Sequence, residues 1–328
     1  GLQKHGENRW SQDGYIVIDD SVFQRTGKEL PGAGEFYDHT EGEPVWGQDL
    51  VYSFYTDYKT SYPLVFRQYE KADDEDQNNE DETKYDLSRE MITELEEEVG
   101  VPADTYLFDS WFAHDSGLIK HVESYDKDWV GPLRSNRQVT YANREMRVDA
   151  LEERIDTEER EIDEETYKIW TKTLPVSKLG EVRLVIAEKV TDEDKENPVK
   201  YLATSKIDAP SAHIIRSYSY RWRIETFFED SKQELGLVLG DCEVRDTDGA
   251  SRHWHLQMLT YSLLRLGSES SVSERLVSKA SSLRAQLEDG LKEAIYNMFS
   301  WVRDHPDRNL DGLMEEIDHL FLHSEGSI

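Results

Sequence analysis

The stretch SYSYRWRIETFFEDSKQELG, residues 217–236, combines dense aromatic residues with an Arg, a Glu and a Lys. At 3.6 residues per turn, its residues fall on two stripes about 80° apart. The apolar stripe holds Ile224, Phe228, Ser231 and Leu235, and the polar stripe holds Tyr218, Arg221, Glu225 and Lys232. The pattern predicts a helix whose apolar stripe faces a core and whose polar stripe faces a cleft. The alternatives are a solvated face on which Arg221 pairs with Glu225, and Glu229 in place of Glu225 as the acid in the cleft.

Two further acids follow apolar runs earlier in the chain. Asp20 ends the β-branched run of GYIVIDDSVF (14–23), and Asp109 follows TYLF. A carboxylate at the end of a buried strand is costly unless it is paired or binds a metal, and ligand sites of α/β sheets lie at those strand ends. We therefore expect both acids in a site. A helix N-cap or a turn is the alternative for each, and Asp19 competes with Asp20 because it leaves the same strand.

The first 137 residues show strand and helix patterns in alternation, which predicts a mixed sheet covered by helices, an α/β fold. Strands are expected over 14–23, twice within 50–70, over 105–112 and over 128–136, and helices over 88–100 and 114–126. The first of these helices is expected to start at a capping Ser, Ser88, and to end at Gly100. The acidic segment 70–86 is expected to be a solvated loop.

The pattern of expected elements changes after residue 138. Strand patterns over 167–176, 181–190 and 200–205 predict a β-rich insertion, and a helical pattern resumes near 210 and includes 254–267 and 271–299. The single cysteine, Cys242, excludes an internal disulfide and a thiolate-rich zinc site.

Composition indicates a folded, acidic protein. The 328 residues include 38 Lys and Arg against 69 Asp and Glu, for a net charge of −31. Since 11% of the residues are aromatic, we expect adaptation to molar salt, where the Debye length falls to about 3 Å, rather than disorder. An ordinary acidic protein of a low-salt cell is the alternative. We see no signal peptide and no apolar run of the roughly 18 residues needed to cross a bilayer, so we expect a cytoplasmic protein.

The spacing Tyr218-x2-Arg221-x3-Glu225-x6-Lys232 resembles the Y-x2-R-x3-E-x6-K signature of insertion-sequence transposases of the DDE (RNase H-like) superfamily. DDS (19–21), FDSWF (108–112) and DWVGPLRSNRQV (128–139) resemble segments around that family's first two acids. The resemblance implies an RNase H-like mixed sheet with flanking helices, a β-rich insertion before the third acid and a helical C-terminal part. The implied boundaries are 1–137 and 207–267 for the core, 138–206 for the insertion and 268–328 for the helical C-terminal region.

The resemblance also implies a site. Asp20, Asp109 and Glu225 would be the catalytic acids and metal ligands, and Asp20 is preferred to Asp19 because the family's acid directly precedes a Thr or Ser, here Ser21. Three carboxylates would hold two Mg²⁺ ions roughly 4 Å apart, with Mn²⁺ as a substitute. The implied reaction is cleavage at transposon ends followed by strand transfer into target DNA.

Double-stranded DNA is the implied partner, bound by a homodimer that assembles on it. The expected DNA contacts are Tyr218, Arg221, Lys232, Arg134, Arg137 and Arg223, the last three from two basic segments, 134–147 and 213–223. Trp222 is expected to be a core aromatic, with base stacking as the alternative, and Trp170 of the insertion is a weaker candidate for holding a flipped base.

Only nineteen residues precede Asp20, where the family places a helical domain that recognises DNA ends. We therefore expect an N-terminally truncated element. Two other functions stay open: a decayed or co-opted derivative that binds DNA without catalysis, and an RNase H-like endonuclease without strand transfer.

Overall fold

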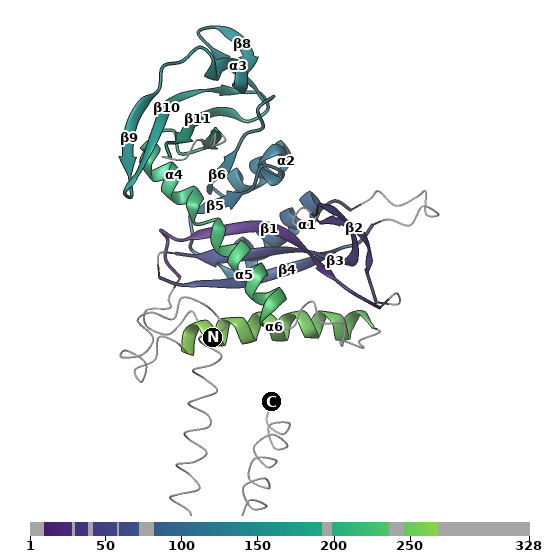
Figure 1. Ribbon diagram of the computed structural model, residues 1–328. Coiled ribbons are helices and arrows are strands. Elements are labelled where there is room, and N and C mark those ends of the chain that lie inside the picture. Colours follow the sequence, from purple (N-terminus) through teal and green to yellow (C-terminus); the bar gives the residue numbers. More distant parts are fainter. Residues whose placement is uncertain are drawn as a thin grey trace, which may run out of the picture. The chain divides into compact units, whose positions relative to one another are not determined.

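The computed structural model describes residues 10–27, 30–38, 42–57, 59–71, 82–191, 199–235 and 246–267 (Figure 1). The strands are β1 (Tyr15–Gln24), β2 (Gly34–Asp38), β3 (Glu43–Thr56), β4 (Ser61–Tyr69), β5 (Thr105–Phe108), β6 (Asp128–Pro132), β7 (Gln138–Tyr141), β8 (Arg144–Arg147), β9 (Glu158–Ile162), β10 (Glu165–Val176), β11 (Gly180–Lys189) and β12 (Lys200–Thr204). The helices are α1 (Lys84–Thr93), α2 (Ser116–Glu123), α3 (Val148–Glu152), α4 (Ser211–Ser219), α5 (Trp222–Gln233) and α6 (Thr247–Gly267), with a π-helical segment, η3 (Glu94–Val99), and a 3-10 turn, η4 (Phe112–His114).

The strands form one mixed sheet in the order β2-β3-β1-β5-β6-β12-β11-β10-β7-β8. Strand β1 is antiparallel to β3 and parallel to β5, β3 is antiparallel to β4, and β5 is parallel to β6. This sheet, with helices flanking it, confirms the expected α/β fold class. The β-rich insertion is also confirmed, because β10, β11 and β12 follow the three predicted segments closely and β12 joins them to β6.

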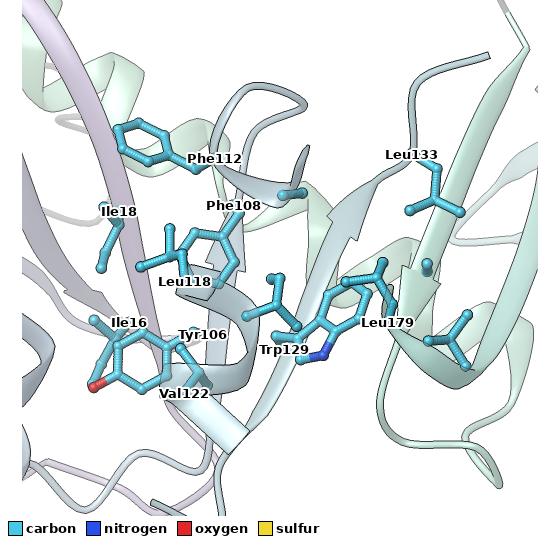
Figure 2. Packing of buried hydrophobic residues seen from close by; sticks show 14 of the residues in the cluster. Ile16, Ile18, Tyr106, Phe108, Phe112, Leu118, Val122, Trp129, Leu133 and Leu179 are labelled. Atoms are coloured by element: carbon cyan, nitrogen blue, oxygen red, sulfur yellow. The ribbon is translucent and has the colours of Figure 1, made fainter. Parts of the chain in front are cut away.

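Strand β1 is buried on both faces because it lies between two apolar cores. On one face, Ile16 and Ile18 pack with Phe108 of β5 and with Leu118 and Val122 of α2 (Figure 2). Buried side chains of α1 belong to the same core. This core continues past Trp129 of β6 to Leu179 of the insertion. The opposite face is covered by α5 and α6.

The α5 face is rich in aromatic contacts. The ring of Phe227 lies 5.3 Å from that of Tyr52, 5.5 Å from that of Phe54 and 4.9 Å from that of Tyr261, measured between centroids. Ile224, Phe228 and Ser231 of the predicted apolar stripe are buried as well. The fourth residue of that stripe, Leu235, follows the end of α5 and is half-buried. The packing of these rings fixes how α5 lies against β1 and β3.

Replacing Phe227 with Ala is expected to lower the free energy of unfolding by about 3–5 kcal/mol, because it leaves a cavity among three rings. Equilibrium denaturation in concentrated KCl measures this loss. Trp222→Ala is the matched control on the same helix, since Trp222 is 65% exposed, and it should change stability by about 0.5 kcal/mol or less. Equal losses in the two variants would contradict the packing described here.

Helix α1 begins earlier than the sequence pattern predicted. The expected cap, Ser88, is buried inside the helix and donates its hydroxyl to the carbonyl oxygen of Lys84. The cap is Thr83, which forms a capping box with Asp86. The helical segment ends as predicted at Gly100, whose φ is 68°. Strand β2 was not predicted.

Several expectations lie outside the described residues: most of the acidic segment 70–86, Cys242, the helix over 271–299 and the helical region 268–328. The helices of the described ranges include none that is long and apolar enough to span a membrane.

Candidate active site

Asp19 and Asp20 point to opposite faces of the sheet. Successive residues of a strand alternate in direction, and the register pairs Asp19 with Tyr52 and Asp20 with Val51. Tyr52 packs against α5, whereas Val51 belongs to the core under α1 and α2. Asp19 therefore faces α5, and Asp20 faces α1.

On the α5 face, Arg221 joins two acids that are remote in the sequence. Its Nη1 donates to Asp19 Oδ2 over 2.6 Å, and its Nη2 donates to Glu225 Oε1. The Arg221 side chain is 15% exposed and that of Asp19 13%. The pairing of Arg221 with Glu225 was the alternative in which this face of the helix is solvated, but here the pair is largely enclosed and holds the first strand's acid as well.

Asp109 lies beside this group. The parallel register ends with Ile18 opposite Phe108, and Asp19 and Asp109 are the next residues of the two segments. The charge of Asp109 acts on Asp19, and the charges of Asp20 and Arg221 act on Asp109. Asp109 Oδ1 accepts hydrogen bonds from the backbone N–H groups of Trp111 and Phe112, at 2.9 and 2.8 Å. These bonds fix Oδ1 of Asp109, as expected for the turn residue that was the alternative for this acid. The other carboxylate oxygen, Oδ2, stays available for a ligand.

The electrostatics of Asp19 and Asp109 indicate a shortage of positive charge. Burial raises the pKa of Asp19 well above its usual value, and the carboxylate of Asp109 raises it further, while Arg221 opposes both. Burial also raises the pKa of Asp109, against the hydrogen bond from the Phe112 N–H, and the carboxylate of Asp20 adds to the increase. A cation that enters between these groups would gain two ionised ligands and release protons.

Tyr218 completes the group on the α5 face. The guanidinium carbon of Arg221 lies 5.8 Å from the centroid of its ring, and the charges of Asp109 and Asp19 contribute to its raised pKa, after burial. Lys232 is placed differently: its Nζ lies 5.3 Å from the ring centroid of Phe23, farther along β1 than Asp19. Of the four signature residues, Tyr218, Arg221 and Glu225 therefore lie together on the side of Asp19, whereas Lys232 lies apart from them.

The predicted single helix is interrupted at this point. The N–H of Arg221 bonds to the carbonyl oxygen of Tyr218, and the N–H of Ile224 bonds to that of Arg221. These tighter bonds of the 3-10 kind separate α4 from α5, and Arg221 lies in the turn between them.

On the opposite face, Asp20 belongs to a second charged cluster. Lys84 Nζ lies 2.6 Å from Asp20 Oδ2 and 2.5 Å from Asp49 Oδ2. Burial raises the pKa of Asp49 to about 6; the carboxylate of Asp20 adds to this, and Lys84 opposes it. The sequence analysis singled out neither Asp49 nor Lys84. The signal for Asp49 was a carboxylate directly before the apolar run LVYSF.

Two expected surface roles need correction. Arg137 is only 8% exposed, and its guanidinium donates to the carbonyl oxygen of His114 at 3.0 Å, so it supports a loop from inside rather than facing DNA. Trp222 is the reverse case: it was expected in the core and is largely exposed. Arg134 and Arg223 are exposed, as DNA contacts would have to be. Trp170 packs edge-on against Tyr141, at 5.9 Å between centroids.

The residues present fit a divalent cation, although no three His, Cys, Asp or Glu side chains in the described ranges are already gathered as a metal cluster. Carboxylate oxygens are the hard ligands that Mg²⁺ prefers. Burial, together with a neighbouring carboxylate, raises the pKa of Asp19 and of Asp109, and a bound cation would oppose this increase. Asp19, Asp109 and Glu225 are the residues that would hold such an ion.

Carboxylates that come from β1, from the residue after β5 and from α5 are of the kind that hold the metal ions of phosphoryl-transfer sites. Residues 7–154 match the model of a family described as DDE superfamily endonuclease. The matched range is somewhat less than half of the chain. It contains Asp19, Asp20 and Asp109 and ends before α5. The chain is thus similar to DDE-type nucleases across the part that supplies the first two acids.

The other comparisons add little to this. No curated protein matches the chain. Among solved structures, the NurA nuclease from Sulfolobus solfataricus is similar at 10% identity, with 80% of this chain and 87% of that chain covered and a TM-score of 0.30. A likeness at that level carries no argument about activity.

Replacing Asp49 with Asn is expected to flatten the pH dependence of stability between pH 3.8 and about pH 6. In this window the folded state keeps a proton on Asp49 that the unfolded state has lost, so this carboxyl contributes stability that disappears as the pH rises. The charged groups facing it are Asp20 of β1 and Lys84 of α1. The wild type should lose on the order of 2 kcal/mol more than the variant across the window, as measured by denaturation at a series of pH values. Parallel curves would contradict the raised pKa.

Proposed function

We propose that this chain is a metal-dependent DNA endonuclease of the DDE type, with Asp19, Asp109 and Glu225 as its catalytic acids. The observation that carries the proposal is the arrangement around Arg221, which binds an acid of β1 and an acid of α5 at once, next to the acid that follows β5. The family match over residues 7–154 supports it independently.

Asp19 takes the place that the sequence analysis gave to Asp20. Both acids lie in the DDS segment, but only Asp19 is bonded to the arginine that also binds Glu225, whereas Asp20 is bonded to Lys84 on the other face. Asp20 remains the alternative first acid, and the two acids make opposite predictions for mutagenesis.

The other residues of the site have roles that follow from their contacts. Two divalent ions, when bound, would supply an activated water and stabilise the departing oxygen. The backbone bonds to Asp109 hold its carboxylate in one orientation, and Arg221 does the same for Glu225. The planar guanidinium of Arg221 could donate to a phosphate as well, and the Tyr218 ring limits where Arg221 can move.

We further propose that the enzyme is a transposase, which joins the cut strand to a second DNA, and that a homodimer performs this on double-stranded DNA. The Y-x2-R-x3-E-x6-K spacing supports this finer assignment, because Tyr218, Arg221 and Glu225 gather around Asp19 and Asp109. An endonuclease without strand transfer is the second candidate, favoured by the description of the matching family.

A single assay distinguishes the candidates. The protein is incubated in concentrated KCl with Mg²⁺ or Mn²⁺, a supercoiled plasmid and a labelled duplex with a free 3′-hydroxyl. Label joined to the plasmid, through a new bond between that hydroxyl and a plasmid phosphate, supports a transposase. Nicked plasmid without joined label supports an endonuclease. Binding of the duplex with neither product would mean a derivative that only binds DNA, and would contradict the enzyme proposal.

A further inference from the structure

A half-buried lysine lies between two carboxylates on the sheet face away from Arg221. Lys84 is the first residue of α1, and its Nζ lies within 2.6 Å of Asp20 Oδ2 and 2.5 Å of Asp49 Oδ2. The side chains of Lys84 and Asp49 are 17% and 2% exposed. The rings of Tyr69 and Trp111 lie 5.5 and 5.8 Å from the same nitrogen. The ammonium group is therefore bound by two carboxylates and lies beside two aromatic rings.

The register of β1 and β3 places the two carboxylates close together. The antiparallel register pairs Asp20 with Val51 and Val22 with Asp49, so Asp20 and Asp49 lie diagonally on one face of neighbouring strands. One oxygen of Asp49, Oδ1, is buried and has no hydrogen-bond partner. A buried carboxylate oxygen without a partner is costly, and it marks an unused ligand position next to the ammonium group.

The position of Lys84 on its helix shows that its attraction to Asp20 and Asp49 outweighs the unfavourable helix dipole. The first turn of a helix carries a partial positive charge and disfavours a cation. Lys84 nevertheless lies there, and the charges of Asp20 and Asp49 raise its pKa although burial acts in the opposite direction. The Thr83–Asp86 capping box fixes this turn of the helix, so the backbone of Lys84 is held where its ammonium group contacts Asp20 and Asp49.

We propose that Lys84 is a built-in cation occupying a position in which Asp20 and Asp49 would otherwise bind a divalent metal ion. Magnesium sites commonly use one or two carboxylates and water, which is what this pair offers once the ammonium group is removed. The consequence for catalysis rests on the proposed function: Lys84 keeps divalent ions off the α1 face and leaves them to Asp19, Asp109 and Glu225.

The test is the number of Mn²⁺ ions bound by the purified full chain, titrated in concentrated KCl and followed by the electron paramagnetic resonance signal of free Mn²⁺. Lys84→Met, which keeps the length of the side chain and removes its charge, should bind about one more ion than the wild type. The double variant Lys84→Met with Asp49→Asn should return to the wild-type number, and Lys84→Arg should equal the wild type. An unchanged number in folded Lys84→Met overturns the proposal.

Lys84→Met could lose its fold, because buried Asp49 and half-buried Asp20 are left without a cation. In that case the proposal predicts that Mn²⁺ restores cooperative unfolding to Lys84→Met and to Lys84→Gln, but not to Lys84→Met with Asp49→Asn. Failure of millimolar Mn²⁺ to restore it would overturn the proposal.

The outcome is independent of catalysis. If the wild type binds no Mn²⁺ and cuts no DNA, the proposed function fails, but a gain of one ion in Lys84→Met still supports the built-in cation. If the wild type cuts DNA and Lys84→Met gains no ion, only the built-in cation is wrong.

Discussion

Replacing Glu225 with Gln is expected to lower the rate of metal-dependent DNA cleavage by about 10³-fold or more. The substitution removes one of the three proposed anionic ligands, and stabilisation of transition-state charge by a bound metal is worth several kcal/mol, of which about 4 kcal/mol corresponds to a thousandfold in rate. Glu225 is suited to this role because its carboxylate is held by the same arginine as Asp19. Single-turnover nicking of a plasmid with Mg²⁺ or Mn²⁺ measures the effect.

The matched control is Glu229→Gln, the rival carboxylate of the sequence analysis. Glu229 lies on the same helix, is exposed, and accepts a long 3.4 Å hydrogen bond from Gln233. Its loss should change the rate by about twofold or less, since exposed interactions contribute little. Binding of DNA in Ca²⁺ and the circular dichroism of both variants should match the wild type. A larger loss for Glu229→Gln than for Glu225→Gln would contradict the assignment.

The second large effect concerns the two neighbouring acids of β1. Asp19→Asn should lower the cleavage rate by about 10³-fold, for the same reason as Glu225→Gln. Asp20→Asn should lower it by about tenfold or less, because Asp20 is bonded to Lys84 on the opposite face of the sheet. Both are isosteric changes at adjacent positions, so each is the control for the other.

The thermal stability of the two variants separates a catalytic loss from a folding loss. Asp20→Asn removes one of the two acids that hold half-buried Lys84, and we expect its effect mainly on stability. If the order is reversed, with Asp20→Asn inactive and Asp19→Asn active, Asp20 is the first acid, as the Ser that follows it had suggested.

Much of the fold could be predicted because its signals are local. The apolar stripe of α5 follows from the spacing of Ile224, Phe228 and Ser231. The strands of the insertion follow from β-branched runs that ended within a few residues of the observed β10, β11 and β12. The helical segment formed by α1 and η3 was placed with its end correct, at Gly100, and its start late, since Ser88 looked like a cap and Thr83 was the cap.

The site could be predicted only in part, because its details depend on contacts between distant residues. The sequence shows that Asp19 and Asp20 leave the same strand. It does not show which face α5 will cover, and Arg221 lies 202 positions away from Asp19. The cluster of Lys84, Asp20 and Asp49 was missed for the same reason: its members come from α1, β1 and β3, and no spacing in the chain connects them.

The solvent exposure of individual side chains was also predicted wrongly in two cases. Arg137 was grouped with exposed basic residues, but its guanidinium bonds to backbone carbonyl groups inside the protein. Trp222 was assigned to the core because it is aromatic, although it lies at the first turn of α5, off the buried stripe. Adaptation to molar salt and the dimer stay predictions.

The position of Mn²⁺ in a crystal soaked with the ion, located by anomalous scattering, tests the proposed site most directly. We expect a signal at coordination distance, roughly 2.0–2.3 Å, from carboxylate oxygens of Asp19, Asp109 and Glu225, and none between Asp20 and Asp49, where Lys84 lies. A signal bound by Asp20 and Asp49, with none at the other three acids, would contradict the proposed site.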